Sequence, residues 1–468
     1  DGPITITPAD PLSVTVSLVA GANLGVNADW WALANTPSGW YRYNRVTDSW
    51  VPGQDVSYQG PLFKMSTREI ANRSGLPTGV YTISFEVDTT MNGVQDKPIF
   101  SDSVEVTISS ACLPGTDSDG DRLDNCYETN TGVYVSPTDT GTDPNNADTD
   151  GDLIDDGDEV LGTIQKLDLP GMGANPLRQD IFLEYDWFDD SLECGSHSHR
   201  PTQNAVDMVT RSFANSTIVN PDKTTGITLH NDRGQGGLFV GGNLISDVDG
   251  VLTGGVNSPE FQAHKAANFA SNRHGYFHYV ILPHRYNTNS GSSGQAELPG
   301  DDLIVSLYCA NSDGNVGHTI MHELGHNLNI RHGGNQDCNY KPNYNSVMNY
   351  KYQFPGVDSN CTPPGDGVLD YSVGDRIDLD ETALNENLGT CGTVAWDWNS
   401  NGVIETGVVY DINPLGNAGC GGAYTVLRDY NDWANLYMGG LLDADGAIPM
   451  DQKETISCDN PPPMVQYP

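Results

Sequence analysis

The chain has 468 residues and a formal net charge of −40, from 62 acidic and 22 basic side chains. This length predicts about two or three domains. The charge excludes nucleic acid and anionic lipid surfaces as partners, because both repel an acidic protein. No apolar run reaches the roughly 18 residues that a membrane span requires. The acidic residues have two interpretations, a solvated surface or a set of cation ligands.

Residues 1–110 consist of short runs in which apolar and polar side chains alternate, such as "LSVTVSLVA", "GVYTISFEVD" and "DSVEVTIS". Gly, Pro and Asn clusters separate these runs. The pattern predicts an antiparallel, immunoglobulin-like β-sandwich. The aromatic stretch "DWWALANTPSGWYRYN" is assigned to packing within that sandwich, and we assign this domain no chemistry.

Residues 111–178 form an acidic linker with an internal repeat. The segments "DSDGDRLDNCYE" (117–128) and "DTDGDLIDDGDE" (148–159) each place acids at positions one, three, five, eight and twelve. Oxygens at alternate positions of a tight turn, closed by a carboxylate, suit a cation of calcium's size. The calcium ligand candidates are Asp117, Asp119, Asp121, Asp124 and Glu128, then Asp148, Asp150, Asp152, Asp155 and Glu159.

These loops differ from an EF-hand, because glycine stands at the fourth position while Arg122 and Leu153 occupy the sixth. They resemble instead the thrombospondin type 3 repeats of bacterial exported proteins, including the spacer "GTDPNNADTDGD". That resemblance implies bound calcium with a structural role. The alternative is an acidic linker that stays disordered, because like charges repel.

A third and weaker calcium candidate is "DWNSNGVIE", residues 397–405. It offers oxygens from Asp397, Asn399, Asn401 and Glu405, and it places Gly402 at the turn.

Residues 179–468 are predicted to form an α/β domain with a C-terminal subdomain. We expect strands at 180–188, 226–232, 277–286 and 302–308, helices at 202–216 and 258–271, and a loop at 286–302. A helix carrying the segment "GHTIMHELGHNLNIRHGG" (317–334) follows the last strand. We also expect the strand at 302–308 to form a sheet edge that pairs with an extended peptide.

That helix contains the pattern expected of a zinc site. His322 and His326 are four residues apart, so both rings project from one face of the helix. Glu323 is placed to act as a general base without binding the metal. His332 is the predicted third ligand, which requires the helix to stop. Asn329 tolerates the left-handed backbone that such a turn needs.

The same region resembles the metzincin clan of zinc endopeptidases, whose pattern is HExxHxxGxxH with a methionine-containing turn. Asn329 replaces the glycine of that pattern, and "NSVMNY" (345–350) supplies the turn. The resemblance implies that His322, His326 and His332 hold zinc and that Met348 packs beneath them. It also implies that Glu323 is the base for a zinc-activated water, and that Tyr350 approaches the metal or the oxyanion.

Other assignments remain open for this region. Glu381 or Glu386 could supply a third ligand, as in gluzincins, although that leaves His332 and Met348 without a role. His318, one turn before His322, is interpreted as a hydrogen-bonded helix histidine. No claim is made for His197 and His199 in "CGSHSHR".

Nine cysteines without a CxxC pair favour the disulfides of an exported protein over a cysteine-rich zinc module. Proximity suggests three pairs, namely Cys112 with Cys126, Cys338 with Cys361, and Cys391 with Cys420. The odd count leaves at least one cysteine outside an internal pair.

Together these features predict a bacterial enzyme, secreted or associated with the cell surface, that hydrolyses protein or peptide substrates with zinc and is stabilised by calcium. The competing hypothesis is a calcium-ordered adhesin or scaffold whose peptidase-like domain is inactive. The retained Glu323 argues against a scaffold, because a binding module has no use for a general base. The sequence does not determine the cleavage preference or the oligomeric state.

Overall fold

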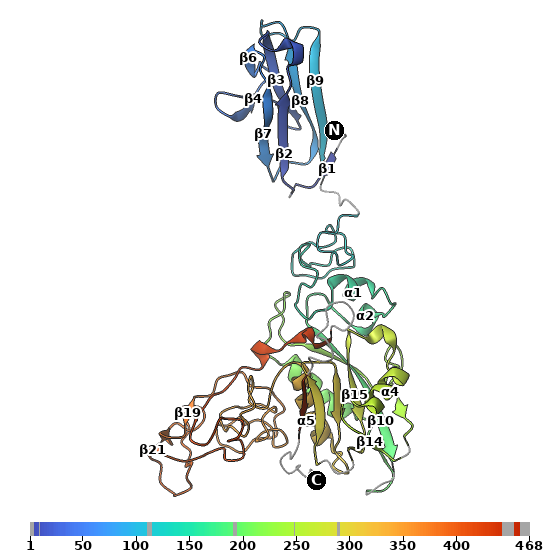
Figure 1. Cartoon of the computed structure of the whole chain (residues 1–468), viewed down its shortest axis with the longest axis vertical. Coiled ribbons are helices and arrows are strands. Elements are labelled where there is room, and N and C mark those ends of the chain that lie inside the picture. Colours follow the sequence, from blue (N-terminus) through green and yellow to red (C-terminus); the bar gives the residue numbers. More distant parts are fainter. Residues whose placement is uncertain are drawn as a thin grey trace. The chain divides into compact units, whose positions relative to one another are not determined.

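The computed structural model describes residues 4–8, 10–109, 115–190, 194–247, 249–287, 291–441 and 454–458. The chain divides into two compact units, Asp1–Thr116 and Asp117–Pro468 (Figure 1). The predicted calcium repeats therefore belong to the same compact unit as the predicted catalytic domain. No helix among the described residues is both long and apolar enough to cross a membrane.

The first unit is a β-structure in two layers. Its larger sheet has the order β1-β9-β8-β3-β4-β5, with β6 on β3, and a separate sheet pairs β2 with β7. The strands are β1 (Ile4–Ile6), β2 (Leu12–Leu18), β3 (Asn27–Thr36), β4 (Gly39–Asn44), β5 (Ser49–Pro52), β6 (Tyr58–Pro61), β7 (Met65–Arg73), β8 (Gly79–Asp88) and β9 (Ile99–Ile108).

The inward side chains of both layers form one core, in which Leu12 and Ile70 meet Ala32, Ile83 and Val106. Burying every second residue of a strand produces this arrangement. The pairing is antiparallel except between β1 and β9, which run parallel. Trp30 and Trp31 are buried, as the packing interpretation predicts.

The second unit contains a mixed sheet of order β11-β10-β15-β18-β17-β23, with β12 and β13 on β10. The strands are β10 (Asp180–Asp190), β11 (His197–Ser198), β12 (Thr228–Asp232), β13 (Leu244–Ile245), β15 (Phe277–Leu282), β17 (Gly294–Leu298), β18 (Asp302–Val305) and β23 (Glu454–Ser457). The pairs of β10 with β12, β13 and β15, and of β15 with β18, are parallel, whereas β11, β17 and β23 run antiparallel to their partners.

Helices cover both faces of this sheet. The helices are α1 (Asp156–Leu161), α2 (Leu169–Met172), α3 (Gln203–Ala214), α4 (Pro259–Asn268) and α5 (Asp313–Asn327). Leu183 and Val280 of the sheet pack with α3 and α5, whereas Phe182, Tyr279 and Ile281 pack on the opposite face with α2 and α4. Strands β15 and β18 are buried on both faces. Strand β10 buries Glu184 and Asp186 as well as apolar side chains, and these carboxylates contact Arg273 and Tyr279 respectively.

Two expectations for the sheet are wrong. The predicted loop at 286–302 contains the strand β17, which pairs antiparallel with β18. Strand β18 is consequently not a sheet edge, because β15 and β17 flank it. The Gly and Ser residues around this segment suggested a loop, but pairing with β18 supplies its backbone hydrogen bonds instead.

The acidic repeats pack on the start of β10. Asp152 Oδ2 accepts a hydrogen bond from the Asp180 amide at 2.6 Å, and Arg122 forms an ion pair with Asp158. Asp121 of the first repeat accepts a hydrogen bond from the amide of Gly157, in the second repeat, at 2.9 Å. The two repeats and the sheet therefore share one hydrogen-bonded structure.

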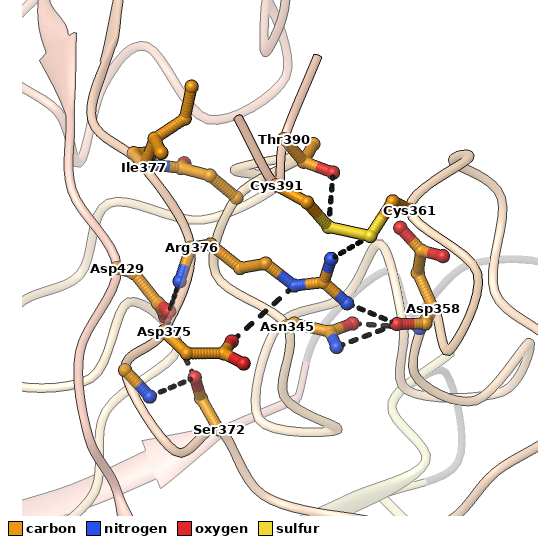
Figure 2. Close-up of polar contacts among 12 residues, drawn as sticks. Asn345, Asp358, Cys361, Ser372, Asp375, Arg376, Ile377, Thr390, Cys391 and Asp429 are labelled. Atoms are coloured by element: carbon orange, nitrogen blue, oxygen red, sulfur yellow. Dashed lines mark hydrogen bonds and ion pairs between the residues drawn. A yellow bond between two sulfur atoms is a disulfide. The ribbon is translucent and has the colours of Figure 1, made fainter. Parts of the chain in front are cut away.

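Residues after the methionine turn form a subdomain of short paired segments. The strands are β19 (Leu379–Asp380), β20 (Leu384–Asn385), β21 (Thr406–Val408) and β22 (Val426–Leu427), and β14 (Val251–Leu252) pairs with β16 (Arg285–Tyr286) nearer the main sheet. Figure 2 shows Arg376 beside the Cys361–Cys391 disulfide, where its guanidinium donates to the Asp358 carbonyl and its amide donates to Asp429 at 3.0 Å. Asn345, at the start of the methionine turn, also donates to the Asp358 carbonyl, so this network joins the turn to the subdomain.

The disulfides differ from the pairs that proximity suggested. Those among the described residues are Cys194–Cys309, Cys338–Cys420 and Cys361–Cys391. The predicted pairs Cys338 with Cys361 and Cys391 with Cys420 are wrong, because pairing of β19 with β22 returns the later chain to Cys338. Cys126 is disulfide-bonded, whereas Cys112 lies outside the described residues.

Candidate functional site

Helix α5 carries the predicted metal ligands and is buried along most of its length. It begins at Ser312, whose side chain accepts a hydrogen bond from the Asn315 amide at 3.2 Å and so caps the helix. Ile320, Met321 and Leu324 pack into the core beneath the sheet. The helix is therefore fixed from below, and its histidines are held in place.

Helix α5 ends at Asn327, five residues before His332. Asn329 has φ of +69°, and the Ile330 amide donates to the Gly325 carbonyl at 2.8 Å. A residue with left-handed backbone, followed by an amide that donates to a carbonyl of the last helical turn, commonly ends a helix and reverses the chain direction. The reversal returns His332 to the face of α5 that carries His322 and His326.

The structure brings the three predicted histidines together. Their ring centroids lie 4.8 Å apart for His322 and His326, 4.9 Å for His326 and His332, and 5.3 Å for His322 and His332. The Nε2 atoms of His322 and His326 are 3.2 Å apart. Tetrahedral zinc with bonds of about 2.0 to 2.1 Å separates its ligand atoms by roughly 3.3 Å. The spacing therefore fits one shared ion.

Backbone carbonyls orient two of these rings. His322 Nδ1 lies 2.8 Å from the Val347 carbonyl, and His326 Nδ1 lies 2.6 Å from the Ile330 carbonyl. Donation from Nδ1 leaves Nε2 as the atom with a lone pair, which is how metal-binding histidines are commonly held. Burial lowers the pKa of His322 to about 4, so the ring is neutral at pH 7. Neutral imidazole is the form that binds metal.

Met348 lies beneath the ligand helix. Its side chain is fully buried, and a Cβ added to Gly325 would overlap the Met348 Sδ. Glycine in the middle of the HELGH motif thus allows the methionine turn to approach the helix closely. The same turn supplies the Val347 carbonyl that orients His322.

Glu323 and Tyr350 border the histidines. Glu323 is completely buried, and burial raises its pKa well above the ordinary value, with a smaller opposing contribution from Cys458. The ring centroid of Tyr350 lies 4.5 Å from that of His332, and burial raises the pKa of its phenol. A side chain on Gly294 of β17 would overlap the Glu323 carboxyl, so this strand and the carboxyl are adjacent.

A cysteine that sequence reasoning left without a role occupies the same site. Cys458 Sγ lies 3.8 Å from His326 Nε2 and 3.9 Å from His332 Nε2. The thiol and the three imidazoles form a single buried group whose ligand atoms all lie within 4.8 Å of one another. Cys458 is 126 residues from His332 in sequence, so no local motif could have indicated it.

The rival ligands lie elsewhere. Glu381 accepts hydrogen bonds from the amides of Ile412 and Thr425, and Glu386 accepts one from the Trp398 amide. Both carboxylates therefore organise loops of the subdomain. His318 lies with Nδ1 against the Gln353 carbonyl, which agrees with the interpretation of a hydrogen-bonded helix histidine.

The two acidic repeats adopt the same local structure. Asp117 accepts hydrogen bonds from the amides of Gly120 and Arg122, at 2.7 and 3.0 Å. Asp148 does the same for Gly151 and Leu153, at 2.8 and 2.9 Å. Arg122 and Leu153 adopt φ of +83° and +70°, where an EF-hand has glycine. Each loop is therefore a tight turn with its acidic side chains directed inward.

Several carboxylate oxygens in these loops are buried without a hydrogen-bond partner among the described residues. They are Asp119 Oδ1 and Oδ2, Glu128 Oε2, Asp150 Oδ2, and Glu159 Oε1 and Oε2. Burial, then the neighbouring carboxylates, raises the pKa of Glu128 to about 8 and of Asp150 to about 9. Uncompensated buried carboxylates are costly unless a cation binds them.

The structure places further acids beside the predicted ligands. Asp156 follows the predicted Asp155 at the start of α1, and Asp180 begins β10. Their charges contribute to the raised pKa values of Glu128 and Glu159 respectively. Asp180 is outside the repeat, so its role depends on the packing of the repeat against the sheet. Asp124 and Asp155 have no buried carboxylate oxygen that lacks a hydrogen-bond partner.

The third predicted loop has a turn like the first two. Asp397 accepts hydrogen bonds from the amides of Asn401 and Gly402, at 3.2 and 2.7 Å. Asn399 accepts one from Asn401, whose own side chain donates to Glu405 at 3.0 Å. The oxygens of this loop therefore accept hydrogen bonds from within the loop, and none of these four side chains has a buried oxygen without a hydrogen-bond partner.

No protein-family model, curated protein or solved structure matches this chain. Function is consequently inferred from the geometry of the site alone. The arrangement can hold a metal in three neutral imidazoles next to one buried carboxyl group.

The close contact between α5 and the methionine turn leads to a testable prediction. Alanine in place of Gly325 would normally stabilise a helix by about 1 kcal/mol. Here Gly325→Ala should destabilise the protein by about 1 to 3 kcal/mol, because its Cβ overlaps Met348. Gly291→Ala is the matched control, since nothing lies within 4 Å of its added Cβ. Thermal unfolding of both variants measures the effect, and a stabilised Gly325→Ala would contradict the packing.

Proposed function

We propose that this chain is a secreted, calcium-stabilised zinc endopeptidase of the metzincin type. The single observation that carries the proposal is the convergence of His322, His326 and His332 beside the buried Glu323. Three buried neutral imidazoles and an adjacent carboxyl have a direct use in metal-assisted hydrolysis and little use in packing.

The residues present fit zinc. Three imidazoles are a common ligand set for catalytic zinc, and the nitrogen spacing of 3.2 Å is suitable. Zinc bound there supplies a Lewis acid that polarises a carbonyl oxygen and lowers the pKa of a bound water. The carbonyls of Val347 and Ile330 keep the Nε2 atoms available for it.

The chain's own residues would move the proton. Glu323 is a carboxyl group that borders the three imidazoles, and its raised pKa suits a group that takes a proton and then returns it to the leaving amine. Tyr350 is placed beside His332, where its phenol can donate a hydrogen bond to an oxyanion. Strand β17 lies beside Glu323 and pairs with β23 on its outer side, so an extended peptide could add there only in place of β23.

The acidic repeats would bind calcium. Their orphaned carboxylate oxygens converge within two turns of equal geometry, and hard cations prefer oxygen ligands. Calcium would neutralise the buried negative charge and bind only the folded form, which raises stability. The disulfides are compatible with an oxidising, extracellular location.

The competing function is a calcium-ordered scaffold with an inactive peptidase-like domain. The two-layered N-terminal unit and the repeats suit either function. The buried Glu323 favours the enzyme, because burying an unpaired carboxyl costs stability and a scaffold gains nothing from it.

Replacing the proposed base tests the enzymatic function. Glu323→Gln keeps the shape of the side chain and should lower peptide hydrolysis by about 10² to 10⁴-fold. Zinc content should remain unchanged, because Glu323 is not a ligand. Casein and mixed peptide libraries serve as substrates, with Cys458→Ser in both chains so that the thiol is absent from the site.

Glu86→Gln, in the separate N-terminal unit, is the control and should keep full activity. Equal activity of Glu323→Gln and its parent over all substrates would favour the scaffold.

Calcium removal should make stability depend on pH. The folded pKa values of Asp121, Glu128 and Asp150, about 6, 8 and 9, lie above the ordinary value of about 4. The folded protein therefore holds these protons more tightly than the unfolded chain, and metal-free stability should fall as pH rises from about 4 to about 9. Calcium should remove most of that fall, because it stabilises the ionised carboxylates.

Melting temperatures measured between pH 5 and 8, with calcium or with a calcium-selective chelator, test this expectation. Identical pH profiles under the two conditions would contradict calcium binding by the repeats.

A further inference from the structure

A second group of imidazoles lies at the carboxyl ends of two parallel strands. Asp190 ends β10, His197 and His199 follow it, and His284 follows β15. His199 Nε2 and His284 Nδ1 lie 2.8 and 3.3 Å from Asp190 Oδ2 and 3.3 Å from each other. The ligand atoms of all four side chains fall within 4.8 Å of one another.

The geometry repeats that of the first histidine group. The ring centroids of His197, His199 and His284 lie 4.6, 5.3 and 5.4 Å apart, close to the 4.8, 4.9 and 5.3 Å of the triad. Nitrogen and oxygen atoms 2.8 to 3.3 Å apart approach the separation of roughly 3.3 Å that tetrahedral zinc imposes. A buried histidine that serves only packing requires one hydrogen-bond partner, not three converging side chains.

The surroundings would hold these ligands in place. The side chains of Asp190, His199 and His284 are 5, 3 and 0 % exposed. His197 Nδ1 lies 2.7 Å from the Gly195 carbonyl, an orientation that suits a ligand bound through the other nitrogen. The Cys194–Cys309 disulfide anchors the chain three residues before His197.

We propose that Asp190, His197, His199 and His284 form a second, structural site for a zinc-class divalent metal. Four protein ligands close the coordination shell, which distinguishes a structural site from a catalytic one with an open position. The ion would join the ends of β10 and β15 to the loop that precedes α3.

Zinc content of the full chain tests this site. After dialysis, the wild type should hold two zinc ions, and His199→Asn and His326→Asn one each, as measured by elemental analysis. His274→Asn, an exposed histidine outside both groups, is the control and should hold two. His199→Asn with two ions would overturn the second site.

Zinc titration of a metal-free chain with both His322→Asn and His326→Asn, which leaves only two of the four side chains of the first group, decides the question even where His199→Asn fails to fold. One equivalent bound supports the second site, and none overturns it. Zinc binding by His199→Asn tests the triad of His322, His326 and His332 in the same way. Failure of the proposed catalytic site and failure of this site therefore give different results.

Discussion

The reversal of the chain at Asn329 is the constraint on which the candidate site depends. A helix that continued past His326 would carry His332 about two to three turns beyond the other two histidines. The left-handed backbone at Asn329 ends α5 and returns His332 to the same face. Three side chains separated by up to ten residues thus come to share one point, and the adjacent Glu323 is enclosed with them.

The surrounding structure holds that point by backbone groups and close packing. Carbonyls of Val347 and Ile330 fix two imidazoles, and Met348 fills the space that Gly325 leaves open. Elements already packed in the core therefore orient the histidines. The methionine turn supports α5 and His322 through Met348 and the Val347 carbonyl.

Negative charge shapes the rest of the second unit. The repeats bury carboxylates whose like charges oppose folding, and the hydrogen bonds of Asp121 and Asp152 tie them to α1 and β10. A cation bound in these loops would offset the repulsion between the carboxylates, because each of them is attracted to the ion. The net charge of −40 is thus partly located in folded loops and not only on a solvated surface.

The sequence by itself determined the local features, namely the helix with His322 and His326, the turn at Asn329 and the paired acidic loops, because each depends on spacing along a few residues. It missed β17, the pairing of the cysteines, and the approach of Cys458 and of Asp190 to distant histidines. Only the tertiary structure decided these. Strand β17 is a short segment between Gly and Ser residues that takes its backbone partners from β18 and β23, and the disulfides and the contact of Cys458 join residues 30 to 132 positions apart, so no local spacing indicates them.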